Sequence, residues 1–437
     1  MLRHRFDREI LRLAGPAFIT LLAEPLYLLT DTAVVGHLGT AQLGGLAVAS
    51  AILLTGHSLC IFLAYGTTAA VARMLGAGDK RSAADQAVQG LWLGLAVGVV
   101  LSALVALGSE TLVDWLGAEA DVAASALVYL RISLVGFPFL LVTLAGTGYL
   151  RGLQDTRTPL LVALGTVAAN LAIEVVLIYG FDQGIGASAL ATVIAQGGGA
   201  VVYVRTVVRA ASRDGARLRP DPAAQRRLIR VGLDLMVRTV ALRASLVALT
   251  AVATRLGEVE VAAHVIAFEV WNLTAMGLDS LAIAGQAMVG RYLGAGSGEE
   301  ARAASWRLLQ LGVMGGAVVG LALAALSPFL GRVFSPDPAV VALAGFLLLW
   351  VAVLQPLGAV AFVLDGVLIG AGDQRFLARA MLGAAVALGA VLAVVVRLDL
   401  GMGWVWLSFG TLMAVRSLTL VVRFRGDSWV VLGRPVR

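Results

Sequence analysis

The sequence is poor in the residues that build metal centres and covalent active sites. It contains a single cysteine, Cys60, and four histidines among 437 residues. One cysteine cannot form an intrachain disulfide or a thiolate metal site, and a thiol within an apolar helix is read as buried and inert. The histidines show no metal-ligand spacing, no Ser/His/Asp or Cys/His set stands out, and the pattern GxxxxGK[ST] is absent. We therefore predict no enzymatic activity, no bound cofactor and no metal centre.

Charged residues are also scarce, which excludes an ordinary soluble domain. They form 14% of the chain against 59% hydrophobic residues, and the mean hydropathy is +0.90. The apolar run after Arg12 continues through His37 as a full span, whereas a cleavable signal peptide would be short. Apolar stretches of bilayer-spanning length predict twelve transmembrane helices, near residues 9–36, 44–74, 86–108, 122–150, 159–180, 184–209, 226–255, 259–291, 302–328, 339–369, 377–397 and 401–423.

The chain reads as two copies of itself, offset by 218 residues without a gap. The segment RMLGAG at 73–78 returns as RYLGAG at 291–296, and Pro138 falls on Pro356. We predict an all-α integral membrane protein with twelve transmembrane helices in two pseudo-symmetric six-helix bundles. The predicted lobes are residues 1–209 and 226–437, joined by a polar cytoplasmic linker at 210–225. An even number of crossings per half predicts a parallel repeat, and membrane proteins of this kind usually bind cargo where the halves meet.

Arginine placement predicts the orientation. The amino terminus and every second loop collect most of the basic residues, whereas the opposite loops hold only Arg255, Arg332 and Arg397 alongside five acids. Because basic loops stay in the cytoplasm, both termini are predicted to be cytoplasmic. This asymmetry, together with contact to anionic membrane lipid, accounts for the net charge of +6, so nucleic acid is not an expected partner.

The acids inside the predicted spans are the candidate functional residues, because a carboxylate at mid-membrane costs about 2.5–3.5 kcal/mol on insertion scales. Glu24 and Asp31 lie seven residues apart on one face of the first helix, and Asn170 and Glu174 lie four apart on the fifth. The alternative is that these acids pair with Arg131 or with backbone groups and only fasten helices together. Two prolines, Pro16 and Pro25, remove backbone hydrogen bonds and allow the first helix to bend.

The intramembrane acids do not follow the repeat. Asp365 on the tenth helix corresponds to Thr147, and Asp31 corresponds to Leu249. An acid that only stabilised the duplicated scaffold would be expected in both halves. Acids present in one half alone therefore indicate a binding site. Asp234 and Arg238, four residues apart on the seventh helix, are expected to pair with each other.

Several motifs resemble the multidrug and toxic compound extrusion (MATE) transporters. DTAVVG at 31–36 followed by Leu38-Gly39 is similar to their first-helix signature, LRGLQDTR at 150–157 resembles the loop after their fourth helix, and residues 284–296 look like the end of their eighth. The resemblance covers nearly the whole chain and is closest to the DinF-like branch, in which the amino-terminal lobe carries the coupling acids. It implies a MATE-like fold and site residues that fall on Asp31, Asn170, Glu174, Tyr129, Thr192 and Asp365. The glutamate at 174 and the extra acid Glu24 depart from the pattern.

This resemblance implies a secondary active multidrug antiporter of the bacterial plasma membrane, working as a monomer. It would export small cationic or amphipathic organic compounds by alternating access, in exchange for H⁺ or, less favoured, for Na⁺ bound at Asp31, Asn170 and Glu174. Burial and a neighbouring acid both favour a protonated carboxyl group, which suits the proton.

Three alternatives remain. A major-facilitator transporter also has two parallel six-helix halves, but its GxxxDRxGRR-type loop is absent. A lipid or lipid-linked precursor flippase of the same superfamily would need a cationic cavity, for which Arg131, Arg238 and Arg243 are available. A membrane scaffold without transport would not need acids placed outside the repeat.

Overall fold

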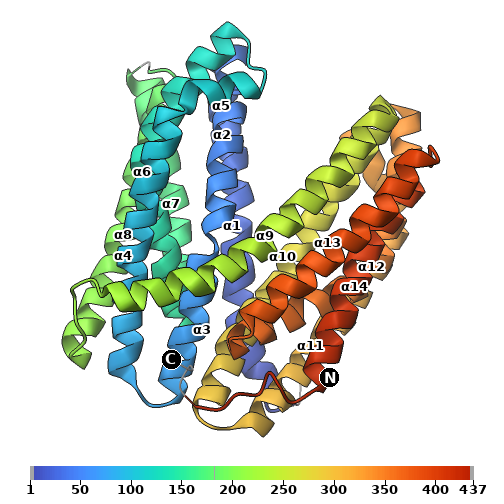
Figure 1. Ribbon diagram of the computed structural model, residues 1–437. Coiled ribbons are helices and arrows are strands. Elements are labelled where there is room, and N and C mark those ends of the chain that lie inside the picture. The colour runs from blue at the N-terminus through green and yellow to red at the C-terminus, as the bar shows by residue number, and fades with distance from the viewer. Residues whose placement is uncertain (1–3, 182, 434–437) are drawn as a thin grey trace. The chain divides into compact units, whose positions relative to one another are not determined.

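The computed structural model describes residues 4–181 and 183–433, whose regular elements are all helices, with no strand among these residues (Figure 1). Twelve helical segments in this part of the chain are long and apolar enough to cross a membrane, as the sequence predicts. Two of these spans are interrupted, one between α2 and α3 and one where α7 passes into the π-helical turn η1. The elements are α1 (Asp7–Gly36), α2 (Thr40–Cys60), α3 (Phe62–Gly76), α4 (Lys80–Leu107), α5 (Ser109–Trp115), α6 (Ala120–Gly152), α7 (Arg157–Val175), η1 (Val176–Gly180), α8 (Ile185–Asp214), α9 (Pro222–Leu256), α10 (Glu258–Gly294), α11 (Gly298–Phe334), α12 (Pro338–Ala371), α13 (Gln374–Arg397) and α14 (Met402–Arg425).

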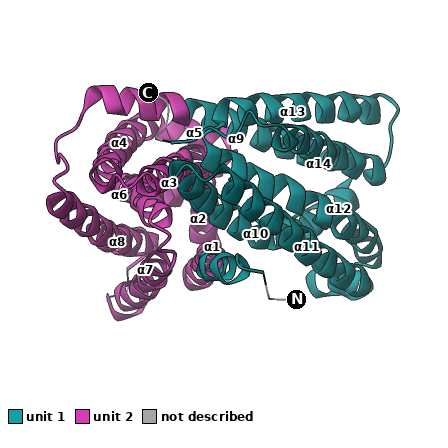
Figure 2. Cartoon of the chain, turned by 90° about the horizontal axis from the view of Figure 1, so that it is seen from below, with its two compact units in different colours: residues 1–18, 233–437 teal, residues 19–232 magenta. Residues whose placement is uncertain are grey.

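The chain forms two compact units, coloured in Figure 2. Unit 1 comprises residues 1–18 and 233–437, and unit 2 comprises residues 19–232. These boundaries differ from the predicted lobes, because both dividing points fall inside helices, one in α1 and one in α9. The predicted linker at 210–225 is non-helical only between α8 and α9, where Gly215 caps α8 with a φ of 70° and Pro222 begins α9.

The two units use equivalent close contacts, which shows the internal duplication in three dimensions. In unit 2, a Cβ on Gly98 of α4 would lie 2.5 Å from the Cα of Pro138 on α6. In unit 1, a Cβ on Gly316 of α11 would lie 3.2 Å from the Cα of Pro356 on α12. Both glycines and both prolines correspond under the 218-residue offset. Small residues let helix backbones approach closely in a membrane, where apolar burial gives no preference for protein over lipid.

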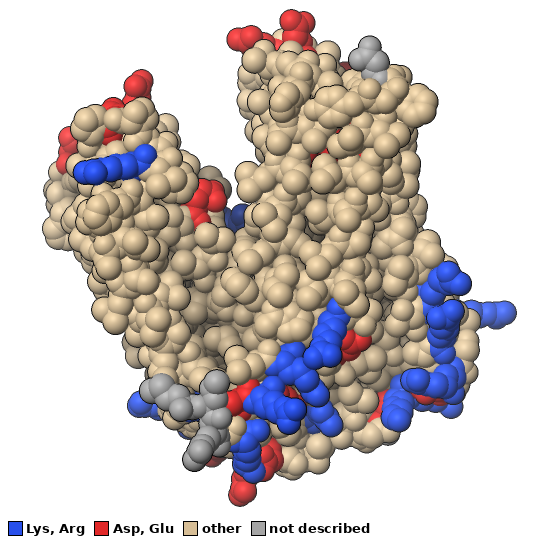
Figure 3. All heavy atoms as spheres, turned by 180° about the vertical axis from the view of Figure 1, so that it is seen from behind, with Lys and Arg blue, Asp and Glu red and all other residues tan. Residues whose placement is uncertain are grey.

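Basic side chains gather at one end of each unit. On the face shown in Figure 3, Lys and Arg are concentrated at the lower ends, and the upper ends carry mainly Asp and Glu. Phe6 and Gly433 lie at the same end of unit 1, since Phe6 packs on Tyr292 and the Gly433 amide donates to the Leu293 carbonyl. A concentration of basic residues at one end is the pattern that the positive-inside rule assigns to the cytoplasmic side.

Candidate functional site

Asp31 lies buried in unit 2, near the carboxyl end of α1, with 1% of its surface exposed. Its carboxylate accepts hydrogen bonds from the Ser188 hydroxyl at 2.5 Å and from the Tyr129 hydroxyl at 3.2 Å. None of the ion pairs found within residues 4–181 and 183–433 includes Asp31. Its charge is therefore solvated by two hydroxyl groups and by no guanidinium.

Glu174 on α7 faces the same carboxylate. It is fully buried, and its carboxyl group lies beside that of Asp31 and beside the Ser188 hydroxyl. Neither of its carboxylate oxygens receives a hydrogen bond from the described part of the chain. Two ionised carboxylates only accept hydrogen bonds, so Asp31 and Glu174 cannot bond to each other until one of them carries a proton. One proton or one small cation bound between the two carboxylates would give the oxygens of Glu174 the partner that they lack.

A network of polar groups extends from this pair. The Thr192 hydroxyl donates to the Ser188 carbonyl at 3.1 Å, and it accepts from Asn170 Nδ2 at 3.1 Å. It lies 2.7 Å from the Tyr27 hydroxyl. Because its single hydrogen is already used, Thr192 accepts from Tyr27. The amide oxygen of Asn170 is buried and receives no hydrogen bond from the described residues.

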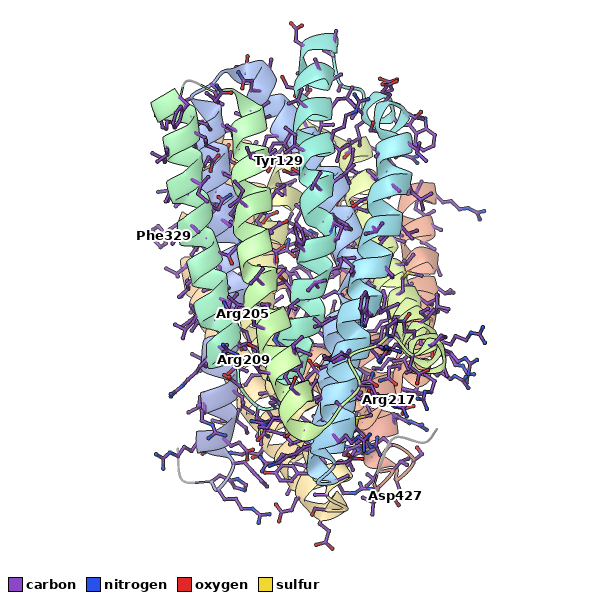
Figure 4. The ribbon with its side chains drawn as sticks, turned by 90° about the vertical axis from the view of Figure 1, so that its left-hand side faces the viewer. Tyr129, Arg205, Arg209, Arg217, Phe329 and Asp427 are labelled. Carbon is purple, nitrogen blue, oxygen red and sulfur yellow. The ribbon has the colours of Figure 1, made fainter. Side chains whose placement is uncertain are left out.

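Four helices of one unit position these groups: α1, α6, α7 and α8. In the side view of Figure 4, Tyr129 lies toward the upper end of unit 2, whereas Arg205 and Arg209 lie toward the lower, basic end. Tyr27 and Ser188 were not predicted from the sequence as members of this site. Each precedes a residue of the predicted set by four positions, Asp31 and Thr192 respectively, and so shares its helix face. A search for polar residues four positions from Asp31 and Thr192 on the same helix would have identified both from the sequence.

Glu24 does not join this cluster. Half of its side chain is exposed, and it lies 3.4 Å from Nδ1 of His57. Arg131 donates to Glu110 at 2.8 Å, and both side chains are more than half exposed. The alternative in which Arg131 neutralises the acids of the first and fifth spans is therefore contradicted by the structure.

Asp365 lies in unit 1 and has a different environment from Asp31. Its carboxylate forms buried ion pairs with Arg238 on α9 and with Arg416 on α14, the latter at 2.8 Å. Asp234 instead lies 3.8 Å from Arg375, so the predicted pair of Asp234 with Arg238 is wrong. An i,i+4 pair on a helix contributes only about 0.2–0.5 kcal/mol, whereas a buried carboxylate is very costly without a cation. The buried acid therefore takes the arginine.

Both predicted helix-bending prolines lie inside α1, which is continuous from Asp7 to Gly36. The boundary between the units, after Phe18, falls between Pro16 and Pro25. The two prolines thus flank the stretch of α1 in which the helix leaves one unit and enters the other. Each removes one backbone hydrogen bond from that stretch.

Known proteins resemble this chain over nearly its whole length. A family model described as MatE matches residues 16–176 and, a second time, residues 235–395. Protein DETOXIFICATION 43 of Arabidopsis thaliana is 29% identical over 97% of this chain and 92% of its own length. DNA damage-inducible protein F of Escherichia coli is 28% identical over 96% of this chain and 92% of its own length. A solved structure of MATE in the bent conformation is similar in fold, with a TM-score of 0.86 at 22% identity over 97% of this chain and 95% of that one. The twofold match confirms the duplication predicted from the sequence.

Proposed function

Because this chain belongs to the MatE family of multidrug and toxic compound extrusion transporters, we propose that it exports small cationic or amphipathic organic compounds in exchange for a cation. Membership makes it an integral membrane transporter rather than an enzyme. The named relatives favour this family over a lipid or lipid-linked precursor flippase. We place it as a monomer in the bacterial plasma membrane with both termini in the cytoplasm.

The pair of Asp31 and Glu174 carries this proposal. Two fully buried carboxyl groups face each other, with hydroxyl donors on one and no donor on the other. In the membrane each ionised acid costs about 2.5–3.5 kcal/mol on insertion scales, so the doubly charged pair is an unfavourable resting state. Binding one cation removes the cost of one of the two charges. The site therefore binds a cation when the pair is ionised, which is the property that an exchange mechanism needs.

We propose the proton as the coupling ion. A proton on Glu174 supplies a hydrogen-bond donor toward the neighbouring carboxylate of Asp31. Sodium is the second candidate, because the carboxylates and the unsatisfied amide oxygen of Asn170 are the oxygen ligands that hard cations prefer. The two ions would compete for one site.

Exchange follows from the charge of the pair. With the pair ionised, the site attracts an organic cation. A cation arriving from the outer side lowers the charge of the pair from two negative charges to one, weakens that attraction and allows cargo to leave outward, while α1 bends between Pro16 and Pro25. A membrane potential of about 100 mV contributes about 2.3 kcal/mol per elementary charge moved inward. That free energy supports a substrate gradient of roughly fifty-fold per net charge.

Transport in proteoliposomes tests the proposal. Purified protein is reconstituted, ethidium is supplied, and a pH gradient or a sodium gradient is imposed separately. We expect ethidium movement driven by the pH gradient, and loss of that movement in Asp31→Asn at unchanged protein level. Glu110→Gln is the matched control, because Glu110 is an exposed acid of the same unit. Ethidium movement by Asp31→Asn at the wild-type rate would refute the assignment, and movement driven only by sodium would replace the proton with sodium.

A further inference from the structure

Helix α1 belongs to both compact units, and its first residues are fixed in unit 1. Arg307 of α11 donates both Nε, at 2.6 Å, and Nη2, at 2.9 Å, to the carboxylate of Asp7, which is 3% exposed. Tyr292 of α10 donates its hydroxyl to Glu9 at 2.9 Å. Ile10 is fully buried one turn further on. Residues 7–18 are therefore anchored to the second half of the chain, although they begin the first half.

Helix α9 shows the reciprocal arrangement. The residues that lead into it are fixed in unit 2 by Gln89 of α4, which donates to the Arg219 carbonyl at 3.0 Å and accepts from the Asp221 amide at 2.7 Å. Trp92, one turn along α4, donates to the Leu218 carbonyl at 2.9 Å. Gln89 is fully buried. The start of the second half is thus anchored to the first half.

The beginning of α9 is also packed against unit 2. A Cβ on Gly232 would lie 2.5 Å from the Phe62 ring of α3, and Val231 faces Gly66 of the same helix. Leu228 packs on the apolar cluster around Leu141. α9 passes into unit 1 immediately after Gly232.

One residue of each anchor occupies an equivalent place in the repeat. Residue 89 and residue 307 are 218 positions apart, so Gln89 and Arg307 correspond to each other. The chemistry differs, a neutral amide in one half and a guanidinium–carboxylate pair in the other, yet each fixes the start of the first helix of the opposite half. The partners do not correspond, since Asp7 falls on Gln225 whereas Gln89 contacts the backbone of residues 219 and 221, so the two halves fix the same helix start through different contacts.

We propose that these reciprocal anchors couple the two units during transport, with Asp7, Arg307 and Gln89 as positioning residues. This inference rests on the proposed exchange function. Asp31 lies in the unit 2 part of the helix that Asp7 anchors to unit 1, so a change at the cation site reaches unit 1 through one continuous helix. Without the Asp7–Arg307 pair, the site would still bind substrate and cation, but binding would no longer change the exposure of the cargo.

Comparison of binding with transport tests this coupling. Asp7→Asn and Gln89→Leu are reconstituted beside Arg5→Gln, the control, whose ion pair with Glu300 is exposed. We expect ethidium affinity within about twofold of wild type in all three, and transport lowered at least about tenfold in the first two only, equivalent to about 1.4 kcal/mol of activation free energy. Partial restoration in the reversed pair Asp7→Arg with Arg307→Asp would support a role for the pair itself.

Two results would overturn the proposal. Either transport by Asp7→Asn equals that of wild type, or affinity and transport fall together as a purely structural defect predicts. If wild type itself moves no substrate, the proposed function fails and the anchors are not the cause.

A cross-link gives a test that does not depend on removing the ion pair. In a Cys60→Ser background, Phe6→Cys and Tyr292→Cys place two thiols where the native rings lie 5.9 Å apart. A short bifunctional methanethiosulfonate reagent then joins the start of α1 to α10 through disulfide bonds that a reductant breaks. We expect transport to persist after cross-linking, because the anchor is closed throughout the cycle. Loss of transport that reverses on reduction would show that the anchor must open, and would refute the proposal.

Discussion

Glu174→Gln is the most informative perturbation of the cation site. The substitution keeps the size of the side chain, removes one buried charge and adds an amide Nε2 donor that can reach Asp31. A hydrogen bond to a charged partner contributes about 1.5–3 kcal/mol, and relief of a buried unpaired carboxylate adds to it. We therefore expect the variant to be more stable than wild type by at least about 1.5 kcal/mol at alkaline pH, where the wild-type pair has lost its proton, and the difference to shrink as the pH falls and the wild-type pair binds a proton.

The same change should abolish coupled transport. A glutamine at 174 gives the site permanently the charge that the pair has with one cation bound. The site can therefore no longer release and rebind that cation. Thermal unfolding in detergent measures the stability, and ethidium flux in proteoliposomes under an imposed pH gradient measures the coupling. Thr166→Val, a change in a different part of α7, serves as the control for general effects on that helix. A variant that is less stable than wild type, or one that still transports in response to the gradient, would refute the reasoning.

Three further outcomes are expected. Asp365→Asn should destabilise the protein by about 3–5 kcal/mol, because it leaves two buried guanidinium groups without their carboxylate, and denaturant unfolding measures this loss. Thr192→Val should weaken cation binding by roughly thirtyfold, because it removes two hydrogen bonds that contribute about 1 kcal/mol each, and the concentration of coupling ion that half-saturates transport measures this effect. Gly98→Val should lower the yield of folded protein because its side chain would overlap Pro138, whereas Gly165→Ala, which faces open space, should fold normally; equal yields would contradict the packing argument.

The sequence was sufficient to predict the fold because the two strongest signals in it are global. Twelve apolar segments and a repeat that keeps one register through Pro138 and Pro356 both extend over the whole chain, and the structure confirms both. The boundary between the units was not predictable in the same way. The linker at 215–221 is polar, but the chain passes from one unit to the other inside α1 and inside α9. The sequence there stays apolar and helical and gives no sign of a boundary.

The candidate site shows a similar division. Asp31, Asn170 and Glu174 were identifiable because acids and amides inside spans are costly, and the structure brings all three together. Ser188 was missed because a serine inside a helix can bond to its own backbone and gives no cost signal. The partners of Asp365 were also missed, since pairing between α12, α9 and α14 depends on tertiary packing that spacing along one helix does not reveal.

The reciprocal anchoring of α1 and α9 bears on how such a chain could arise. If a single six-helix polypeptide formed a twofold pair in which each copy lent the start of its first helix to the other, joining the two copies end to end would produce the contacts seen at Gln89 and Arg307. It follows that neither half of this protein is a complete folding unit. A fragment ending at the linker would lack the segment that covers Gln89 and Phe62, so the halves should become soluble in detergent and functional only when they are produced together.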